Sequence, residues 1–263
     1  MTARVLVVTA VPAERDAVAR AASGGPGAAP GQGDGGPGRD GGPHGDVRRT
    51  DVLGRELHRL RPHGAPGTLW DVLAAGVGPA AAASGAATAL TAAALAGRPY
   101  ALVVSAGIGG GFPGAVAPGG TAVASAVVAA DLGARTPEGF LPVTELGFGT
   151  GAHHPPAALA RAVAEAAGGV LGPVLTVSTV TGTAADAAEL VRRHPGAVAE
   201  AMEGFGVAEA AAAHGVPVLE VRTVSNAVGP RDRAAWRIPE ALAALTGTFR
   251  ATAPVLEGWL TDD

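Results

Sequence analysis

The chain has 263 residues, which suits one large α/β domain or at most two small ones. With 19 basic and 23 acidic side chains, its formal net charge of −4 provides no broad positive field, so neither nucleic acid nor an anionic membrane is an expected partner. It contains no cysteine, which excludes disulfides, thiolate zinc sites and thiol nucleophiles.

The first predicted element is a buried strand. The run ARVLVVT at residues 3–9 is apolar, β-branched and continuous, as in a parallel strand that is covered on both faces. Pro12 and Glu14 follow too soon for a signal peptide or a membrane span. We therefore expect a soluble, cytoplasmic protein.

A glycine- and proline-rich segment at residues 24–45 follows the first predicted helix. It holds eleven glycines and four prolines, and none of its side chains is bulky and apolar. Such a segment buries too little surface to offset the entropy of ordering it. It is therefore expected to be a disordered insertion in a single domain spanning residues 1–263.

Apolar runs and alanine-rich stretches of helix length alternate through the rest of the chain. Such alternation predicts an α/β fold, namely a single-domain, three-layer α/β/α arrangement with a mixed, largely parallel central sheet. The predicted strands are 68–76, 100–107, 121–130, 173–182 and 216–225, and the predicted helices are 79–97, 155–169, 184–194 and 206–215.

Two glycine-rich corners follow predicted strands. In SAGIGGGFPG, residues 105–114, glycines would let backbone N–H groups approach a ligand, although a plain glycine turn is an equal alternative. A dinucleotide-binding fingerprint would open a helix, whereas this corner leads to another strand, so no Rossmann cofactor site is predicted. In the second corner, Gly78 and Pro79 begin a predicted helix. A turn is favoured there over an anion site because no basic residue is adjacent.

Polar side chains occur near the end of the last predicted strand, in VRTVSNA. Arg222 lies in an apolar context, where a cation is costly unless an acid pairs with it. Asn226 is equally consistent with a turn and with a binding site. Glu203, in AMEGFG, lies where a strand leads into a helix, and taken alone it is best explained as the first acid of that helix.

Histidine and serine residues form no catalytic pattern. His153 and His154 precede a predicted helix without an acid at metal-ligand spacing, and no serine lies in a G-x-S-x-G turn. The sequence therefore predicts neither a metal site nor an α/β-hydrolase nucleophile, and no organic cofactor.

Four short motifs follow one another along the chain: AVPAE (10–14), GIGGG (107–111), ME (202–203) and VRTVSN (221–226). In this order the chain resembles the nucleoside phosphorylase and nucleosidase superfamily. It looks most similar to the methylthioadenosine/adenosylhomocysteine nucleosidases and, among these, to the futalosine hydrolases of menaquinone synthesis. The resemblance covers nearly the whole chain apart from 24–45. It implies a nucleoside phosphorylase-like fold and a homo-oligomer that binds a small purine nucleoside and water.

The resemblance also implies roles for individual residues. Glu14 would activate the attacking water, although a helix-capping acid is the favoured explanation without the family. Glu203 would hold the ribose hydroxyls, with Met202 against the sugar, and Arg222 would orient carboxylate and water. Further substrate contacts would come from Gly78, Ile108, Gly109, Gly110, Thr179, Val180, Thr181, Phe205 and Ser225.

Two positions depart from relatives in the superfamily. Relatives that cleave adenine nucleosides carry aspartate where this chain has Asn226, and an amide can both donate to a 6-oxo group and accept from a protonated N7. This favours a hypoxanthine or guanine base. The phosphorylases carry a phosphate-binding arginine where this chain has Ser105, which favours water as the nucleophile. The expected reaction is hydrolysis of futalosine to hypoxanthine and dehypoxanthinyl futalosine.

Several alternatives stay open at the level of the sequence. Arg231, Arg233 or Arg237 could bind the benzoate of futalosine, but a solvated loop or a subunit contact explains these arginines equally well. The chain could also be a methylthioadenosine/adenosylhomocysteine nucleosidase, another purine nucleoside hydrolase or phosphorylase, or an inactive nucleoside-binding protein.

Overall fold

The computed structural model describes residues 2–21 and 47–261, so the insertion predicted at 24–45 lies outside the described residues. One ten-stranded sheet dominates, in the order β11-β10-β6-β12-β5-β1-β4-β3-β2 with β9 on β6. Its strands are β1 (Ala3–Thr9), β2 (Arg48–Val52), β3 (Arg55–Leu60), β4 (Thr68–Ala74), β5 (Leu102–Gly111), β6 (Thr121–Ala129), β9 (Ala152–His153), β10 (Val170–Thr176), β11 (Ala199–Ala201) and β12 (Val218–Ala227).

The sheet is mixed, as predicted, and part of it closes on itself. β1 pairs in parallel with β4 and β5, and β5 pairs in parallel with β12. β12 and β6 are antiparallel, whereas β6 and β10 are parallel. The short strand β11 joins β10 on one side and β5 on the other, so the path from β5 through β12, β6 and β10 returns to β5. The ends of strands that are distant in sequence are thereby brought around one opening.

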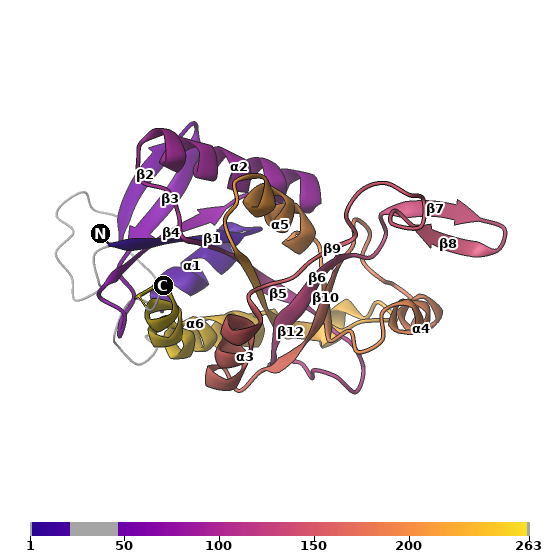
Figure 1. The fold of residues 1–263 in the computed structure, drawn as a ribbon. Coiled ribbons are helices and arrows are strands. Elements are labelled where there is room, and N and C mark those ends of the chain that lie inside the picture. Colours follow the sequence, from indigo (N-terminus) through magenta and orange to yellow (C-terminus); the bar gives the residue numbers. More distant parts are fainter. Residues whose placement is uncertain (1, 22–46, 262–263) are drawn as a thin grey trace.

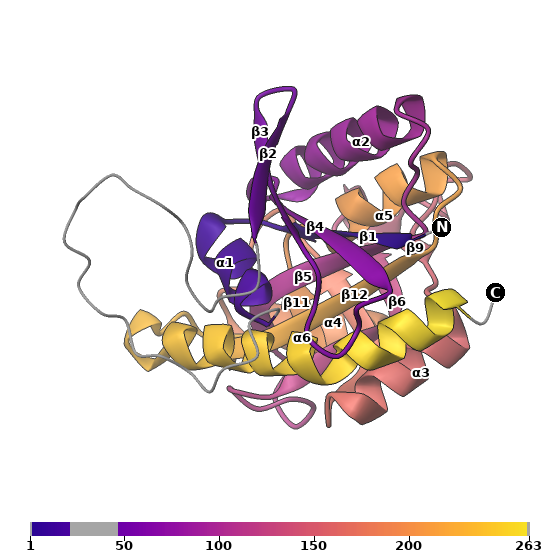
Figure 2. The same cartoon turned by 90° about the vertical axis from the view of Figure 1, so that its left-hand side faces the viewer.

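Six α-helices cover the sheet in the described residues: α1 (Pro12–Arg20), α2 (Pro79–Leu95), α3 (Ala157–Ala166), α4 (Ala184–Arg193), α5 (Gly204–Ala213) and α6 (Ile238–Thr261). α2 and α5 lie on one side of the sheet, and α1, α3 and α6 lie on the other (Figures 1 and 2). The alternation along β1 reflects this, because Leu6 packs in the α2–α5 core and Val7 packs in the core of the opposite layer. This is the predicted three-layer α/β/α arrangement.

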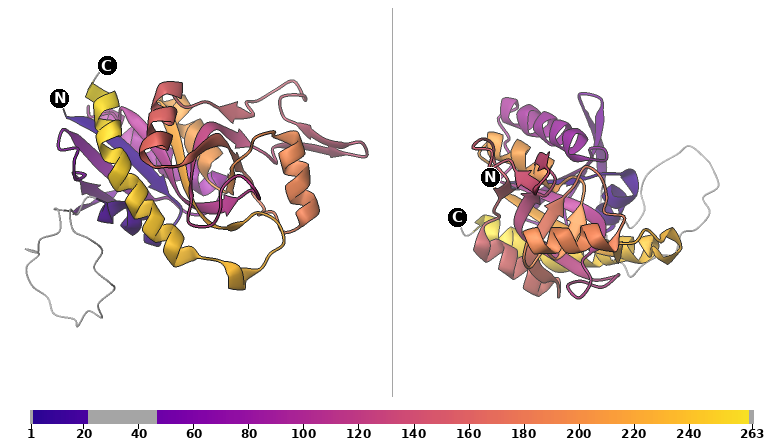
Figure 3. Two further views of the ribbon diagram at one scale, coloured as in Figure 1. Left: turned by 90° about the horizontal axis from the view of Figure 1, so that it is seen from below. Right: turned by 90° about the vertical axis from the view of Figure 1, so that its right-hand side faces the viewer.

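A third cluster of buried apolar side chains lies under α4, where Leu190 meets Leu175 and Val177 from β10 and the residue after it. Near α4, the hairpin of β7 (Gly133–Thr136) and β8 (Gly139–Pro142) forms a separate two-stranded sheet. The hairpin extends away from the rest of the protein (Figures 1 and 3).

The glycine-rich corner at 105–114 differs from the prediction, because most of it is strand. β5 continues to Gly111, with Gly107 beside Arg222 of β12 and Gly110 beside Glu200 of β11. Backbone pairing to two neighbouring strands holds the glycines extended despite their conformational freedom. The site therefore has a strand of glycines where the sequence predicted a loop.

Other elements also differ from the prediction. β10 ends at Thr176, so residues 177–182 form a connection and not the end of a strand. β2, β3, β7 and β8 form hairpins and carry no continuous apolar run that would have predicted them. β2, β7 and β8 have no buried position, whereas β3 buries Leu57, His58 and Leu60. α6 was not predicted; it continues through Pro254, a residue type that usually ends a helix. Among the described residues, no helix combines the length and apolar character needed to cross a lipid bilayer.

Candidate active site

A cavity of about 600 Å³ opens at the carboxyl ends of β1, β5 and β12, which is where open α/β sheets bind ligands. The connection after β10 and the turn from β11 into α5 complete its wall. Among the predicted site residues, the cavity is lined by Glu14, Ile108, Gly109, Gly110, Thr179, Val180, Thr181, Met202, Glu203, Ser225 and Asn226. Residues from both ends of the chain thus meet at one place.

Glu14 is buried at the start of α1 and is held by backbone donors from two elements. Its Oε2 accepts from the N–H groups of Ala10 at 2.9 Å and Val11 at 3.2 Å, and its Oε1 accepts from that of Ile108 at 2.9 Å. Val11 is the N-cap residue of α1, so the bond from its N–H to Glu14 is the N3 half of a capping box without the side-chain half. The helix-capping role and the position in the cavity therefore coexist in one side chain.

Glu203 directly precedes α5, but its carboxylate does not cap that helix. Oε1 accepts from the N–H of Gly78 at 3.2 Å, and Oε2 accepts from Arg222 Nη1 at 3.1 Å. Helix capping therefore does not explain this acid. Gly78 begins α2 with a φ of 92°, which glycine adopts readily, and it positions Glu203 from behind the cavity lining.

Arg222 is fully buried beneath the cavity and is paired, as its burial requires. Besides Glu203, its guanidinium donates from Nε to Glu220 Oε1 at 2.9 Å and from Nη2 to Ser105 Oγ at 2.9 Å. Glu220 was not predicted as a site residue. It lies two residues before Arg222 on the same face of β12, so the signal in the sequence was a pair of charges at strand spacing inside a buried strand.

Burial and neighbouring charges set the ionisation of this group. Burial raises the pKa of the Glu14 carboxyl above its ordinary value, although Arg222 and the N–H groups of Ile108 and Ala10 act in the opposite direction. Burial also raises the pKa of Glu220 against the attraction of Arg222. For Arg222 itself burial acts to lower the pKa, but Glu220, Glu203 and Glu14 outweigh it and the pKa is raised. The site therefore holds one buried cation that interacts with three acids, and the pKa is raised in two of these, Glu14 and Glu220.

Gly107 explains how Glu14 and Arg222 approach each other across β5. A methyl group at this position would lie 2.6 Å from Glu14 Oε1 and 2.8 Å from Arg222 Nη1, closer than real side chains allow. At Gly110 a methyl group would meet the side chains of Val228 and Asn226. The glycines of β5 therefore leave room for functional groups of the neighbouring elements.

Asn226 ends β12 at the cavity wall. Its Oδ1 accepts from Ser225 Oγ at 2.8 Å, and its Nδ2 donates to the carbonyl of Ala227 at 2.9 Å. An amide oxygen has two lone pairs and an amide nitrogen has two hydrogens. One acceptor position and one donor remain on the amide for a ligand.

Glu200 is a third buried acid in the cavity lining, besides Glu14 and Glu203, and the sequence reasoning missed it. It belongs to β11, and both its oxygens accept from Thr181, one from the N–H at 2.9 Å and the other from the hydroxyl. Its signal in the sequence was an acid between alanines in a very short buried strand.

Phe205 is not brought to the cavity. Its ring packs in the core between the sheet and α5, with its centroid 5.3 Å from that of the His153 ring. Of the three arginines considered for the distal end of a substrate, only Arg231 lines the cavity, where its guanidinium lies 5.2 Å from the ring centroid of Trp236. Arg237 is instead paired with Glu240 on the surface.

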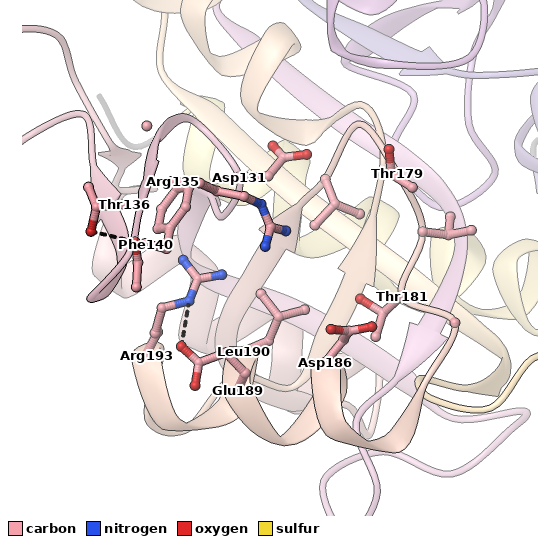
Figure 4. Close-up of a pocket in the computed structure, with 15 residues that line it drawn as sticks. Asp131, Arg135, Thr136, Phe140, Thr179, Thr181, Asp186, Glu189, Leu190 and Arg193 are labelled. Atoms are coloured by element: carbon pink, nitrogen blue, oxygen red, sulfur yellow. Dashed lines mark hydrogen bonds and ion pairs between the residues drawn. The ribbon is translucent and has the colours of Figure 1, made fainter.

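A neighbouring cavity of about 580 Å³ lies between the β7–β8 hairpin and α4 (Figure 4). Arg135 from the hairpin and Arg193 from α4 line it, and Arg193 also lies over the Phe140 ring. Residues Thr179 to Thr181 line both cavities and separate them. Glu14, Glu203 and Asn226 all line the cavity beside β5, so that cavity is the candidate active site. Within the described residues, no group of three or more histidine or acidic side chains is arranged to hold a metal ion.

Comparisons with known proteins agree with this architecture. Residues 67–251 match the family model of the Phosphorylase superfamily. The structure is similar to a 5′-methylthioadenosine/S-adenosylhomocysteine nucleosidase from Colwellia psychrerythraea solved with adenine, with a TM-score of 0.73, 18% identity and coverage of 97% and 95% of the two chains. The corresponding nucleosidase from Streptococcus pneumoniae, solved with a transition-state inhibitor, gives a TM-score of 0.72 at 18% identity and covers 96% and 99%.

Closer sequence relatives share one name. The futalosine hydrolase of Streptomyces coelicolor is 64% identical over 254 residues, which is 97% of either chain. That of Acidothermus cellulolyticus is 51% identical over 166 residues, or 60% of this chain and 66% of the relative. The matched family model, the shared fold and these identities together show that the chain belongs to the phosphorylase superfamily and, within it, to the futalosine hydrolases.

Proposed function

We propose that this enzyme hydrolyses the N-glycosidic bond of futalosine, releasing hypoxanthine and dehypoxanthinyl futalosine. The observation that carries the proposal is that Glu14, Glu203 and Asn226, which are far apart in the sequence, line one cavity. Cleavage of this bond builds positive charge on the ribose and negative charge on the departing base. The two acids can stabilise the positive charge on the ribose, and the amide can bind the departing base.

Glu14 acts as the general base in this proposal. Burial raises the pKa of Glu14 above the ordinary value, which makes its carboxylate a better proton acceptor. Three backbone N–H groups fix the orientation of its carboxylate. A water bound beside Glu14 would give up a proton to it while attacking the anomeric carbon of the ribose.

Glu203 holds the ribose hydroxyls, and Met202 packs beside the sugar. Both residues line the cavity next to Glu14. Arg222 does not reach the cavity lining, so its role is to position Glu203 and to moderate the charge on Glu14. Ser105, which takes the place of a phosphate-binding arginine, is fully buried and accepts from Arg222. Water is therefore the proposed nucleophile.

Asn226 receives the base. The free hydrogen of its amide donates to O6 of hypoxanthine, and its carbonyl accepts from N7 when the leaving base is protonated there. Arg231 is the proposed contact for the substrate's benzoate, because it lines the cavity with its guanidinium over the Trp236 ring and forms no ion pair with an acid among the described residues. The proposal places the enzyme in cytoplasmic menaquinone biosynthesis as a homo-oligomer.

The decisive experiment is to identify the products released from three nucleosides. Purified enzyme is incubated with futalosine, inosine and methylthioadenosine, with and without phosphate, and the free bases are separated by chromatography. The expected result is hypoxanthine from futalosine with no dependence on phosphate. Release of adenine without hypoxanthine would refute the proposal in favour of a methylthioadenosine-type nucleosidase. Turnover that requires phosphate would identify a phosphorylase instead.

A further inference from the structure

Glu200 is a buried acid at the active-site cavity that has no role in the reaction as proposed so far. Its side chain lies on the cavity wall formed by β11 and the connection after β10. Among the described residues, the hydrogen-bond donors that reach it belong to Thr181, and Asp131 adds only repulsion. Burial raises the pKa of Glu200, and the donors of Thr181 oppose this increase. Such an acid is costly unless further donors stabilise it.

The register of the sheet places Glu200 opposite Asn226. Gly110 of β5 pairs with Glu200 on one side and with Asn226 on the other. Neighbouring strands are about 4.8 Å apart, so the two backbones are separated by roughly 10 Å with only a glycine between them. β12 has a register shift between Val224 and Asn226, so the shared face is shown by the cavity, which both Glu200 and Asn226 line. The carboxylate and the amide are thus positioned to flank a planar base above Gly110.

The bonds from Thr181 determine what this wall offers to a base. The N–H and the hydroxyl of Thr181 are both directed to Glu200, so they are not free donors for a ligand. An ionised carboxylate has about four lone-pair positions, and Thr181 uses two of them. The wall therefore presents an acceptor where a free backbone N–H would have presented a donor.

The two classes of purine differ at the matching atom. A 6-oxopurine carries a hydrogen on N1, next to O6, whereas a 6-aminopurine has a lone pair on N1. With O6 and N7 at Asn226, N1 lies on the far side of O6 and faces the wall of β11. A carboxylate there accepts from N1–H of hypoxanthine and repels the lone pair of adenine.

We propose that Glu200 reads N1–H of the base and, together with Asn226, restricts the enzyme to 6-oxopurine nucleosides. This assignment rests on the proposed function of the same cavity. Asn226 alone discriminates at positions 6 and 7, whereas Glu200 adds discrimination at position 1. Thr181 is a positioning residue, since it orients the carboxylate through two hydrogen bonds.

The test compares kcat/KM for futalosine and for its 6-amino analogue in the wild-type enzyme and in Glu200→Gln. Glutamine keeps the shape but offers both a donor and an acceptor, so the preference for the 6-oxo substrate should fall about 10- to 100-fold. Thr181→Val separates this role from simple support of the loop. It removes one of the two hydrogen bonds that orient the carboxylate but keeps the carboxylate itself, so the preference for the 6-oxo substrate should fall by less than in Glu200→Gln. Glu189→Gln, an exposed acid bonded to Arg192 on α4, should change neither rate.

If Glu200→Gln slows both substrates equally, so that the ratio of their kcat/KM values is unchanged, the inference is overturned. Glu200 would then serve only to hold Thr181 in place. Binding to the wild-type enzyme provides a readout that does not depend on how the variants fold. Hypoxanthine should bind at least 10-fold more tightly than 1-methylhypoxanthine, which keeps O6 but lacks N1–H, and equal affinities would count against Glu200. If wild-type enzyme releases no hypoxanthine from futalosine, the proposed function itself has failed.

Discussion

Arg222 shows at the scale of single residues why the acids of this site cannot be interpreted one at a time. It is a fully buried cation that donates to Glu203 and Glu220 and attracts Glu14. Removing one member of such a group leaves the others buried and uncompensated, which commonly costs about 3–5 kcal/mol. Substitutions that keep the shape are therefore the informative ones, because they change chemistry with the least disturbance of folding.

The raised pKa of Glu14 predicts the acid limb of the pH profile. A base must be ionised to act, and a raised pKa means that it becomes protonated at a higher pH than an ordinary glutamate. We therefore expect kcat/KM to fall as the pH is lowered, with a midpoint above the ordinary glutamate value of about 4.3.

Glu14→Gln should remove that limb and lower kcat about 10²- to 10⁴-fold. Single-turnover rates measured across the pH range check both expectations, and circular dichroism reports whether the variant is folded. An acid limb that persists unchanged in Glu14→Gln would assign it to another group.

Asn226→Asp tests the reading of the leaving base. An aspartate cannot donate to O6, and it faces the carbonyl of Ala227 that the amide now contacts. We expect the variant to lose about 1–3 kcal/mol of transition-state stabilisation, so that it releases hypoxanthine from futalosine more slowly. Release of adenine from the 6-amino analogue should increase relative to that of hypoxanthine. Steady-state assays of both substrates measure the ratio, and an unaltered ratio would remove Asn226 from base recognition.

At the scale of elements, the strand β5 contributes to the site through glycines, which have no side chain to occupy the space that neighbouring groups need. Its glycines pair with neighbouring strands. A side chain would meet Glu14 and Arg222 at Gly107 and would meet Val228 and Asn226 at Gly110, whereas at Gly109 and Gly111 it would meet backbone carbonyl groups. Glycine lowers strand stability, so four of them near the end of a strand need a compensating reason. The reason here is the close approach of functional groups.

Gly107→Ala should therefore abolish most of the activity while the protein stays folded. The added methyl group would displace either the Glu14 carboxylate or the Arg222 guanidinium. We expect kcat/KM to fall at least about 100-fold, because displacements of about 1 Å in an active site have such effects.

Gly247→Ala is the matched control for this substitution. Gly247 lies in α6 with no atom within 4 Å of an added methyl group. The control should retain activity and gain up to about 1 kcal/mol in unfolding free energy, since alanine is the better helix former. Kinetics together with urea unfolding separate the two outcomes, and full activity in Gly107→Ala would contradict the proposed packing.

The β7–β8 hairpin is the feature of the whole molecule that bears on assembly. It projects from the body near the active-site end of the sheet (Figure 1). Exposed apolar side chains lie on and beside it, including Leu132, Leu141 and Phe148. An exposed apolar group of this kind is typical of a contact surface. The sequence resemblance independently implies a homo-oligomer.

We expect light scattering after size-exclusion chromatography to give the mass of an oligomer. The double variant Leu141→Asp/Phe148→Asp should shift the mass toward that of the monomer, because burying the new charges in a subunit contact is costly. Arg192→Ala, at another exposed position, should leave the mass unchanged. An active monomeric wild-type enzyme would contradict the expectation.

The sequence by itself determined the fold class and most of the sheet. β1, β4, β6 and β12 are predominantly apolar runs, and α2 to α5 are alanine-rich stretches between strands, so local composition and period were sufficient to predict them. Elements that depend on tertiary support were missed. β11 has three residues and is extended because β10 and β5 both pair with it.

Only the tertiary structure decided which polar groups meet. The motifs placed Glu14, Glu203 and Asn226 at the ends of predicted elements, but their common cavity results from parallel strands that end at one edge. Phe205 lies two residues after Glu203 and yet turns into the core, because positions two apart at the start of a helix face roughly opposite sides of it. The partnership of Arg222 with Glu220 and Ser105, and that of Glu200 with Thr181, depend on strand register and on a connecting segment. Such pairings join residues that no local pattern connects.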